Sequence, residues 1–203
     1  MVSRSTILRV FLGSFFIQAA WSFEKMQGLG FASAIYPALR EIYVDDEEAG
    51  KDAVKRHLVY YNAHPYMASP VIGASMRLEE KVRDKGCAKQ AAADFKKKVM
   101  GPYGAIGDSF FWSAIRPLAS CIGALTALFW GMWGPVIFLV VYNSFHLWMR
   151  WHGLKQGYLL GEGVVGYIKG LNLPYWSLKA RYAASAVLGV LLASIVAGPP
   201  DIA

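Results

Sequence analysis

Apolar positions along this sequence fall into long runs that polar segments separate. Residues 7–39 form the first run, which is interrupted by Gln18, Glu24, Lys25 and Pro37 and by several glycines. A simple membrane-spanning helix rarely tolerates such positions unless they face protein. The pattern therefore predicts an amphipathic helix at the start of the chain that lies on or partly in a membrane.

Two polar segments follow this run. YVDDEEAGKDAVKRH, at 43–57, predicts a largely helical connection that Asp45 or Asp46 caps. The segment 77–98 contains eight basic and four acidic residues, and it predicts a charged helix with a solvated face. Because its basic excess lies between apolar runs, the positive-inside rule places it on the cytoplasmic side of a membrane.

The longest uncharged region runs from Leu118 to Met149 and is interrupted by GMWGP at 131–135. A full crossing needs roughly 20 helical residues, so this region is too short for two ordinary spans and a turn. It forms either one long kinked helix or two short legs of a re-entrant hairpin. The glycine and proline break favours the hairpin.

A last apolar run, 182–198, is just long enough for one membrane span. Two stripes of small residues recur at every fourth position: Ser185, Gly189, Ala193 and Ala197 in this run, and Ala119, Gly123 and Ala127 in the preceding region. Such stripes allow close contact between helices in lipid. We therefore expect the chain to pack against other helices, either its own or those of a partner.

Composition supports a membrane protein rather than a soluble one. Of the 203 residues, 55% are hydrophobic and 17% charged, which lies outside the usual soluble range. The net charge of +7 does not indicate nucleic acid, because the basic residues cluster beside apolar segments and suit an anionic membrane surface. We predict an all-α integral membrane protein with short, re-entrant and broken helices and a C-terminal membrane span.

Several short patterns resemble motifs for cofactor binding, metal binding or catalysis, but their surroundings in the sequence do not match those that each motif requires. GEGVVG at 161–166 matches a dinucleotide-binding pattern, but no clear strand precedes it and no acidic residue follows at the required distance. The four histidines lack metal-ligand spacing, and no serine has the context of a hydrolase nucleophile. We expect no metal, no cofactor and no catalytic centre within this chain.

The segment around Trp21 and Glu24 carries a more informative pattern. On a helix, Trp21, Glu24 and Gly28 would share one face. An indole beside a carboxylate suits a sugar, because the ring covers an apolar face while the carboxylate binds hydroxyl groups. The alternative is that Glu24 pairs with a basic residue and that Trp21 anchors the chain at the membrane interface.

Four stretches in this order resemble component IID of the mannose-family sugar phosphotransferase systems (PTS): WSFEKMQGLGFASAIYPAL, KRHLVYYNAHPYMASPVIG, MGPYGAIGDSFFWSAIRPLAS and GPVIFLVVYNSFHLWMRWHGLKQGYLLG. The patterns W-x-F-E-x-M-Q-x-x-G-F and G-P-x-x-x-x-G-D-x-x-F-W-x-x-x-R-P within them are long and specific. The similarity extends from about Arg9 to Gly161.

This resemblance implies a subunit of a larger transporter. In that family IID and the membrane component IIC form the sugar path, while the cytoplasmic IIA and IIB components phosphorylate the incoming sugar. It implies a multi-pass protein of the bacterial inner (cytoplasmic) membrane that works in a hetero-oligomer. The alternatives are a non-transporting membrane scaffold or regulatory remnant of an incomplete PTS, and an integral-membrane enzyme.

The resemblance also implies site residues. The candidates for contacts with the sugar, shared with IIC, are Trp21, Glu24, Asn62 and His64, with Trp112 as a weaker addition. Pro65 ends any helix at His64, so Asn62 and His64 are expected on irregular backbone that faces a cavity.

Asp108 and Arg116 are expected to have a structural or pathway role. Asp108 follows a glycine-rich stretch, and we expect it to cap a helix that starts near Ser109. The alternative is that Asp108 contacts the sugar. The eight-residue separation from Arg116 is too long for the usual ion pair along a helix.

The resemblance divides the chain into two parts. Residues 1–161 are the IID-like membrane domain, which includes the cytoplasmic segment 77–98. Residues 162–203 are an atypical, shortened C-terminal region with one membrane span at 182–198.

Overall fold

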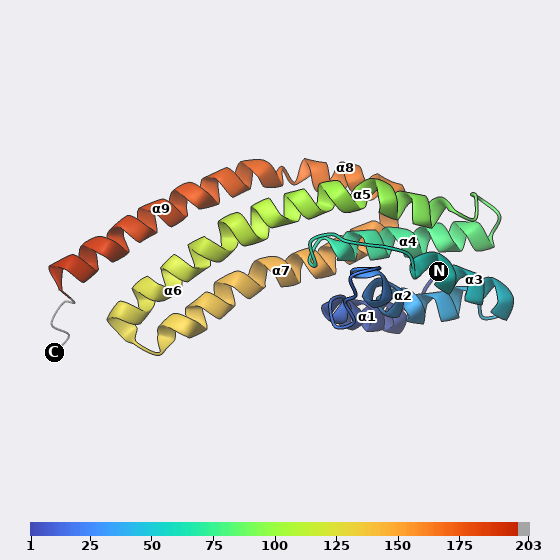
Figure 1. Cartoon of the computed structure of the whole chain (residues 1–203), viewed down its shortest axis with the longest axis horizontal. Coiled ribbons are helices and arrows are strands. Elements are labelled where there is room, and N and C mark those ends of the chain that lie inside the picture. The colour runs from blue at the N-terminus through green and yellow to red at the C-terminus, as the bar shows by residue number, and fades with distance from the viewer. Residues whose placement is uncertain (199–203) are drawn as a thin grey trace. The chain divides into compact units, whose positions relative to one another are not determined.

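The computed structural model describes residues 1–198, and these form an all-helical fold (Figure 1). The helices are α1 (Arg4–Gly13), η1 (Ser14–Phe16), α2 (Gly28–Ile42), α3 (Glu47–His57), α4 (Ala68–Arg83), α5 (Ala91–Gly107), η2 (Asp108–Ile115), α6 (Arg116–Trp130), α7 (Trp133–Leu160), η3 (Gly161–Gly163), α8 (Val164–Gly170) and α9 (Leu173–Ala197). The predicted all-α class is confirmed.

The chain divides into two compact units. We call the first the N-terminal unit; it comprises Met1–Ala105 and Trp148–Gly170. The second, the hairpin unit, comprises Ile106–Leu147 and the segment from Leu171 onward, which the structure describes as far as Gly198.

Close backbone contacts hold the N-terminal unit together. Helix α2 packs against α1, α3 and α4 through an apolar core that includes Phe31 and Ile35. The C-terminal part of α7 lies against α4, where Gly157 approaches the backbone of Pro70 and Ala74. A side chain at Gly157 would place its Cβ 2.9 Å from the Ala74 nitrogen, so this helix pair depends on glycine.

The hairpin unit contains the turn that GMWGP predicts. Gly131 adopts a positive φ of 53° between α6 and α7, a conformation that favours glycine. The predicted turn is confirmed, but the short legs predicted within 118–149 are wrong. The helical backbone continues without a break from Ala91 through the π-helical η2 to Trp130, and α7 extends to Leu160.

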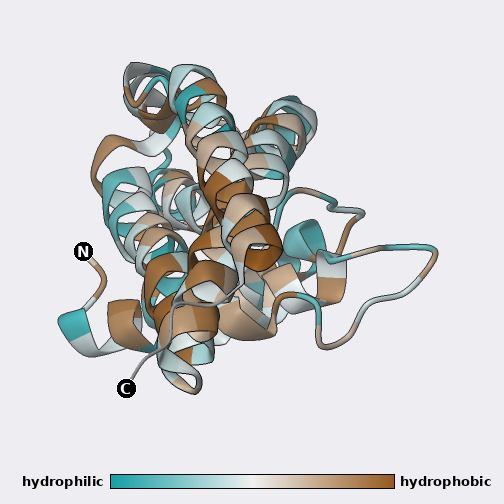
Figure 2. Cartoon of the chain, turned by 90° about the vertical axis from the view of Figure 1, so that its left-hand side faces the viewer, coloured by the Kyte–Doolittle hydropathy of each residue, from teal (hydrophilic) through white to brown (hydrophobic). Residues whose placement is uncertain are grey.

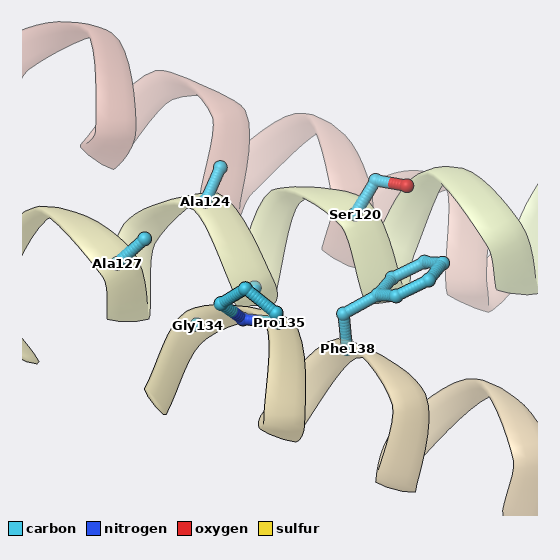
Figure 3. A pocket seen from close by; sticks show the side chains of 7 residues that line it. Ser120, Ala124, Ala127, Gly134, Pro135 and Phe138 are labelled. Atoms are coloured by element: carbon cyan, nitrogen blue, oxygen red, sulfur yellow. The ribbon is translucent and has the colours of Figure 1, made fainter. Parts of the chain in front are cut away.

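The α6 stripe packs within this hairpin. The Cβ of a residue at Gly123 would lie 2.8 Å from the Cβ of Phe138, and Gly134 faces Ala127. Figure 3 shows Pro135 and Phe138 of α7 beside the small residues of α6, where they line a groove of about 390 Å³. Close contact through this stripe, as predicted, is therefore confirmed.

The α9 stripe is arranged differently. Helix α9 packs on η2 and α6 through another face, on which Leu173, Ser177 and Ala184 are buried. The stripe that contains Ser185 and Gly189 is exposed, and nothing described lies within 4 Å of a Cβ placed on Gly189. Figure 2 colours the ribbon by hydropathy, and brown, the colour of hydrophobic residues, recurs along the helices nearest the viewer.

The charged segment 77–98 departs from its prediction. It is not one helix, because α4 ends at Arg83 and α5 begins at Ala91. Its face is not simply solvated either, since Glu79, Glu80 and Lys96 are buried. Each has a polar partner inside the fold: Tyr158 donates to Glu80 at 2.6 Å, and Lys96 donates to a backbone carbonyl at 3.2 Å.

Other local predictions hold. Asp46 caps α3, because its carboxylate accepts a hydrogen bond from the backbone of Ala49 at 2.9 Å. The GEGVVG segment follows a helix rather than a strand, so its rejection as a dinucleotide site is consistent with the fold. The stretches Ala91–Trp130 and Trp133–Ala197 each contain a helix long and apolar enough to cross a membrane, by length and composition.

Candidate functional site

The segment that contains Trp21 and Glu24 is a tight turn, so the helix predicted here is wrong. The backbone N–H of Met26 donates to the Ser22 carbonyl at 2.7 Å, and Ser22 donates back to Met26 at 3.3 Å. The Ser22 hydroxyl also accepts from the backbone of Lys25 at 3.2 Å. Serine competes with helical bonding in this way, and α2 begins only at Gly28.

A second segment pairs with this turn. The backbone N–H of Tyr61 donates to the Lys25 carbonyl at 3.3 Å, and the N–H of Gln27 donates to the Tyr61 carbonyl at 2.8 Å. Gly28 permits this approach, because a Cβ there would clash with the carbonyl of Val59. The two segments that carry the sequence candidates are thus neighbours, although more than thirty residues separate them along the chain.

Glu24 and Asn62 both have exposed polar groups at this junction, as do Ser22 and Lys25 of the turn, while the indole of Trp21 is half exposed. Asn62 lies on irregular backbone before Pro65, as predicted. A carboxylate, a primary amide and an indole on adjoining segments offer acceptors, donors and an apolar face to a polyhydroxylated ligand.

His64 occupies a different environment from Asn62, although both lie in the same loop. Its side chain is buried, and its Nδ1 accepts a hydrogen bond from the backbone of Tyr66 at 3.3 Å. Burial, followed by the positive charge of Arg150, lowers the pKa of His64 to about 3. The imidazole is therefore neutral at physiological pH, and it is buried whereas Asn62 is exposed.

Arg150 is a buried residue near this loop that sequence reasoning did not select. Its guanidinium lies 4.8 Å from the ring centre of Phe15 and 5.1 Å from that of Tyr66. It also donates to the backbone carbonyl and the hydroxyl of Ser14. An arginine within an apolar, aromatic run was the available signal, but such a residue also suits a membrane boundary.

The remaining candidates, Asp108, Trp112 and Arg116, belong to the hairpin unit. All three are exposed, and Asp108 and Arg116 form no ion pair in the described part of the chain. The predicted cap at Asp108 is wrong. No helix starts near Ser109, because Gly107 has helical dihedral angles and joins α5 to η2 without interruption.

A buried carboxylate network supports the N-terminal unit. Glu79 accepts hydrogen bonds from Tyr43 at 2.7 Å and Arg56 at 2.7 Å, and the ring nitrogen of His57 lies 3.0 Å from its other oxygen. Burial would raise the pKa of Glu79, but the bonds from His57 and Arg56 outweigh it and lower the pKa to about 2. Burial lowers the pKa of His57 to about 4. At neutral pH the network thus holds an ionised glutamate and a neutral histidine.

The histidines are dispersed over separate contacts. His57 binds Glu79, and His146 lies 2.6 Å from the side-chain oxygen of Asn143. Among residues 1–198, no three His, Cys, Asp or Glu side chains are grouped as ligands for a metal ion. The junction between the turn that carries Glu24 and the segment that carries Asn62 is instead suited to binding a polyhydroxylated ligand.

Comparison with known proteins identifies the relatives of this chain. A profile described as "PTS system mannose/fructose/sorbose family IID component" matches residues 1–198. The mannose-specific EIID component of Escherichia coli K12 is 34% identical over 192 residues, which cover 94% of this chain and 68% of that protein. The sorbose-specific EIID component of Klebsiella pneumoniae is 33% identical over 195 residues, covering 94% and 70%.

Solved structures agree with the sequence relatives. A cryoEM structure of the mannose transporter ManYZ in complex with microcin E492 contains a chain that is similar to this one, with a TM-score of 0.76 and 34% identity. The similarity covers 94% of this chain and 70% of that chain. A second structure, described as that of a membrane protein, has a TM-score of 0.82, 34% identity and coverage of 93% and 70%.

Proposed function

Because the chain belongs to the IID components of the mannose/fructose/sorbose family of sugar phosphotransferase systems, we propose that it forms a sugar path together with a IIC component. IIA and IIB components would couple uptake through this path to phosphorylation of the sugar. The observation that carries the proposal is the junction at which the exposed Glu24 and Asn62 lie on paired segments. Nothing in the comparisons favours a scaffold or regulatory remnant.

The chemistry of the junction supports a sugar ligand. Glu24 can accept hydrogen bonds from two hydroxyl groups, Asn62 can both donate and accept, and Trp21 can cover a ring face. His64 would support the loop from behind, because it is buried. Trp112 is exposed in the hairpin unit, and its contribution, like any pathway role of Asp108 and Arg116, remains a prediction.

The hairpin unit is suited to the membrane and to a IIC partner. Helix α9 exposes apolar side chains together with the stripe around Gly189, a surface that permits close helix contact in lipid. We place the protein in the bacterial inner (cytoplasmic) membrane with several passes and with segment 77–98 on the cytoplasmic side. The division into an IID-like domain, 1–161, and an atypical region, 162–203, remains a prediction; residues 199–203 lie outside the described part.

The test is sugar binding by the co-purified IIC–IID complex. Titration calorimetry with mannose, fructose and sorbose, the sugars named for relatives, identifies a ligand of the wild-type complex. Glu24→Gln should then weaken binding by about ten- to a hundredfold, because a charge-assisted hydrogen bond is lost. The control is Glu47→Gln, which changes an exposed carboxylate on α3.

Two results would oppose this assignment. Wild-type affinity in the Glu24 variant would leave that carboxylate outside the sugar site, and failure of the variant to assemble would make it a structural residue. Sugar uptake with phosphorylation in cells separates the transporter from a scaffold, which would show neither.

A further inference from the structure

Gln27 is a buried glutamine whose side chain both donates and accepts a hydrogen bond within the fold. Its Nε2 donates to the carbonyl of Ala63 at 2.8 Å, and its Oε1 accepts from the N–H of Ala63 at 3.2 Å. The residue is only 2% exposed. One primary amide thus satisfies both backbone groups of a single residue in the opposite segment.

The residues on both sides of Asn62 are therefore fixed. Tyr61 is fully buried, and its N–H and carbonyl bind the backbone of Lys25 and Gln27. Ala63 is buried and held by the Gln27 side chain. Asn62 alone is exposed between these two anchored neighbours.

We propose that Gln27 is a positioning residue of the sugar site, which fixes the amide of Asn62 relative to the turn that carries Glu24. The inference rests on the proposed function. We call the two hydrogen bonds between the Gln27 side chain and the Ala63 backbone the clamp. A side chain held in its binding geometry loses less conformational entropy when the ligand binds. The clamp therefore increases the affinity for sugar, although Gln27 itself does not touch the sugar.

The backbone contacts explain why the clamp orients Asn62 and is not what pairs the two segments. The bonds between Lys25, Gln27 and Tyr61 involve main-chain atoms only, so they do not require the glutamine side chain. The side chain supplies the second fixed point, at Ala63, beyond Asn62. Without it the loop is anchored to the turn on one side of Asn62 only, so the position of the Asn62 side chain is less well fixed.

The first experiment uses Gln27→Met in the co-purified IIC–IID complex. Methionine keeps the length and the apolar stem but removes both bonds to Ala63. We expect the complex to assemble and to bind its best sugar about tenfold more weakly. The control is Gln18→Met, since Gln18 is exposed in the preceding turn. Wild-type affinity in an assembled Gln27→Met complex would overturn the inference and leave the proposed function intact.

A double-mutant cycle with Asn62→Ala separates positioning from general loosening of the fold. If Gln27 acts through Asn62, Gln27→Met should change affinity by less than about twofold once Asn62 is alanine. If the fold-losses in affinity of the two single variants multiply in the double variant, the two residues act independently and the positioning role is refuted. Absence of binding by the wild-type complex would refute the proposed function itself.

A second substitution covers failure of Gln27→Met to assemble. Gln27→Leu fills a similar apolar volume but has neither a donor for the Ala63 carbonyl nor an acceptor for the Ala63 N–H. Weaker binding by its assembled complex supports the clamp, and unchanged binding rejects it. If neither variant assembles, Gln27 is a residue of the fold rather than of the site, and the inference fails.

Discussion

The two units of this chain differ in how far they bury charged side chains and expose apolar ones. The N-terminal unit buries charged groups and satisfies them internally, as Glu79 shows with Tyr43, Arg56 and His57. The hairpin unit instead exposes large apolar side chains at Trp130, Met132, Trp133 and many positions of α9. The first unit obtains its stability from contacts within the chain, whereas the second requires lipid or a partner to cover its apolar surface.

This difference determines where substitutions should show their effects. A change in the buried networks or glycine contacts of the N-terminal unit should alter the stability of the isolated chain in detergent. A change on the exposed faces of the hairpin unit should leave that stability nearly unchanged.

Removal of the central carboxylate should produce the largest effect. Glu79→Ala leaves Arg56 and Tyr43 without their partner inside the fold, and breaking a buried ion pair from one side costs about 3–5 kcal/mol. Thermal unfolding of the purified chain in mild detergent measures the loss. Glu47→Gln, in the exposed pair with Lys51, should leave the melting temperature unchanged. Equal effects of the two variants would show that burial of Glu79 contributes nothing.

In the wild-type chain, acid should reduce the stability that the same network provides. The folded-state pKa of His57 is about 4, below its usual 6.5, so the unfolded chain binds a proton that the folded chain does not. Stability is therefore present above pH 6.5 and is lost as the pH falls towards 4, by up to about 3 kcal/mol. The lowered pKa of Glu79 extends the loss further, between its usual value of 4.5 and about 2.

Melting temperatures measured between pH 4 and 8 test this dependence. His57→Gln removes the titrating ring, and it should flatten the change between pH 6.5 and 4 while lowering stability at neutral pH. An unaltered slope in that variant would assign the acid sensitivity to other groups.

The local sequence patterns predicted those elements whose causes are local. Asp46 followed by a helical run predicts the capped start of α3, and GMWGP predicts the turn at Gly131. The small-residue spacing also identified the α6 face that contacts α7. In each case the physical cause, a side-chain cap, a positive φ or a small side chain, lies within a few residues of the signal.

The turn at 21–27 and the buried charges were missed because segments distant in the sequence contribute to both, in the turn alongside the local bonds of Ser22. Helical spacing of Trp21 and Glu24 is compatible with a helix until Tyr61 and Ala63 pair with the segment. Likewise Glu79 resembles any solvated glutamate in a charged run, and only α2 and α3 bring its partners to it. The resemblance selected the exposed Glu24 and Asn62 but provided no contact that would reveal Gln27 or Arg150.

A glycine substitution in the N-terminal unit should have an intermediate effect. Gly157→Ala places a methyl group 2.9 Å from the Ala74 nitrogen and forces α7 away from α4, which should cost about 1–3 kcal/mol. Gly166→Ala is the control within the same unit, because nothing described lies within 4 Å of its Cβ. A melting temperature lowered equally in both variants would indicate a general effect of alanine rather than a clash at the α4–α7 contact.

The smallest effect, with the opposite sign, should come from Gly189→Ala on α9. Its Cβ meets nothing described within 4 Å, so only helix propensity acts, and the isolated chain should gain at most about 1 kcal/mol. The same detergent melts compare it directly with Gly157→Ala. In the co-purified IIC–IID complex the gain should persist if lipid covers the Gly189 stripe, and should become a loss if a partner helix packs closely against it. A loss in the isolated chain would contradict the exposure of this stripe and, with it, the contrast between the two units.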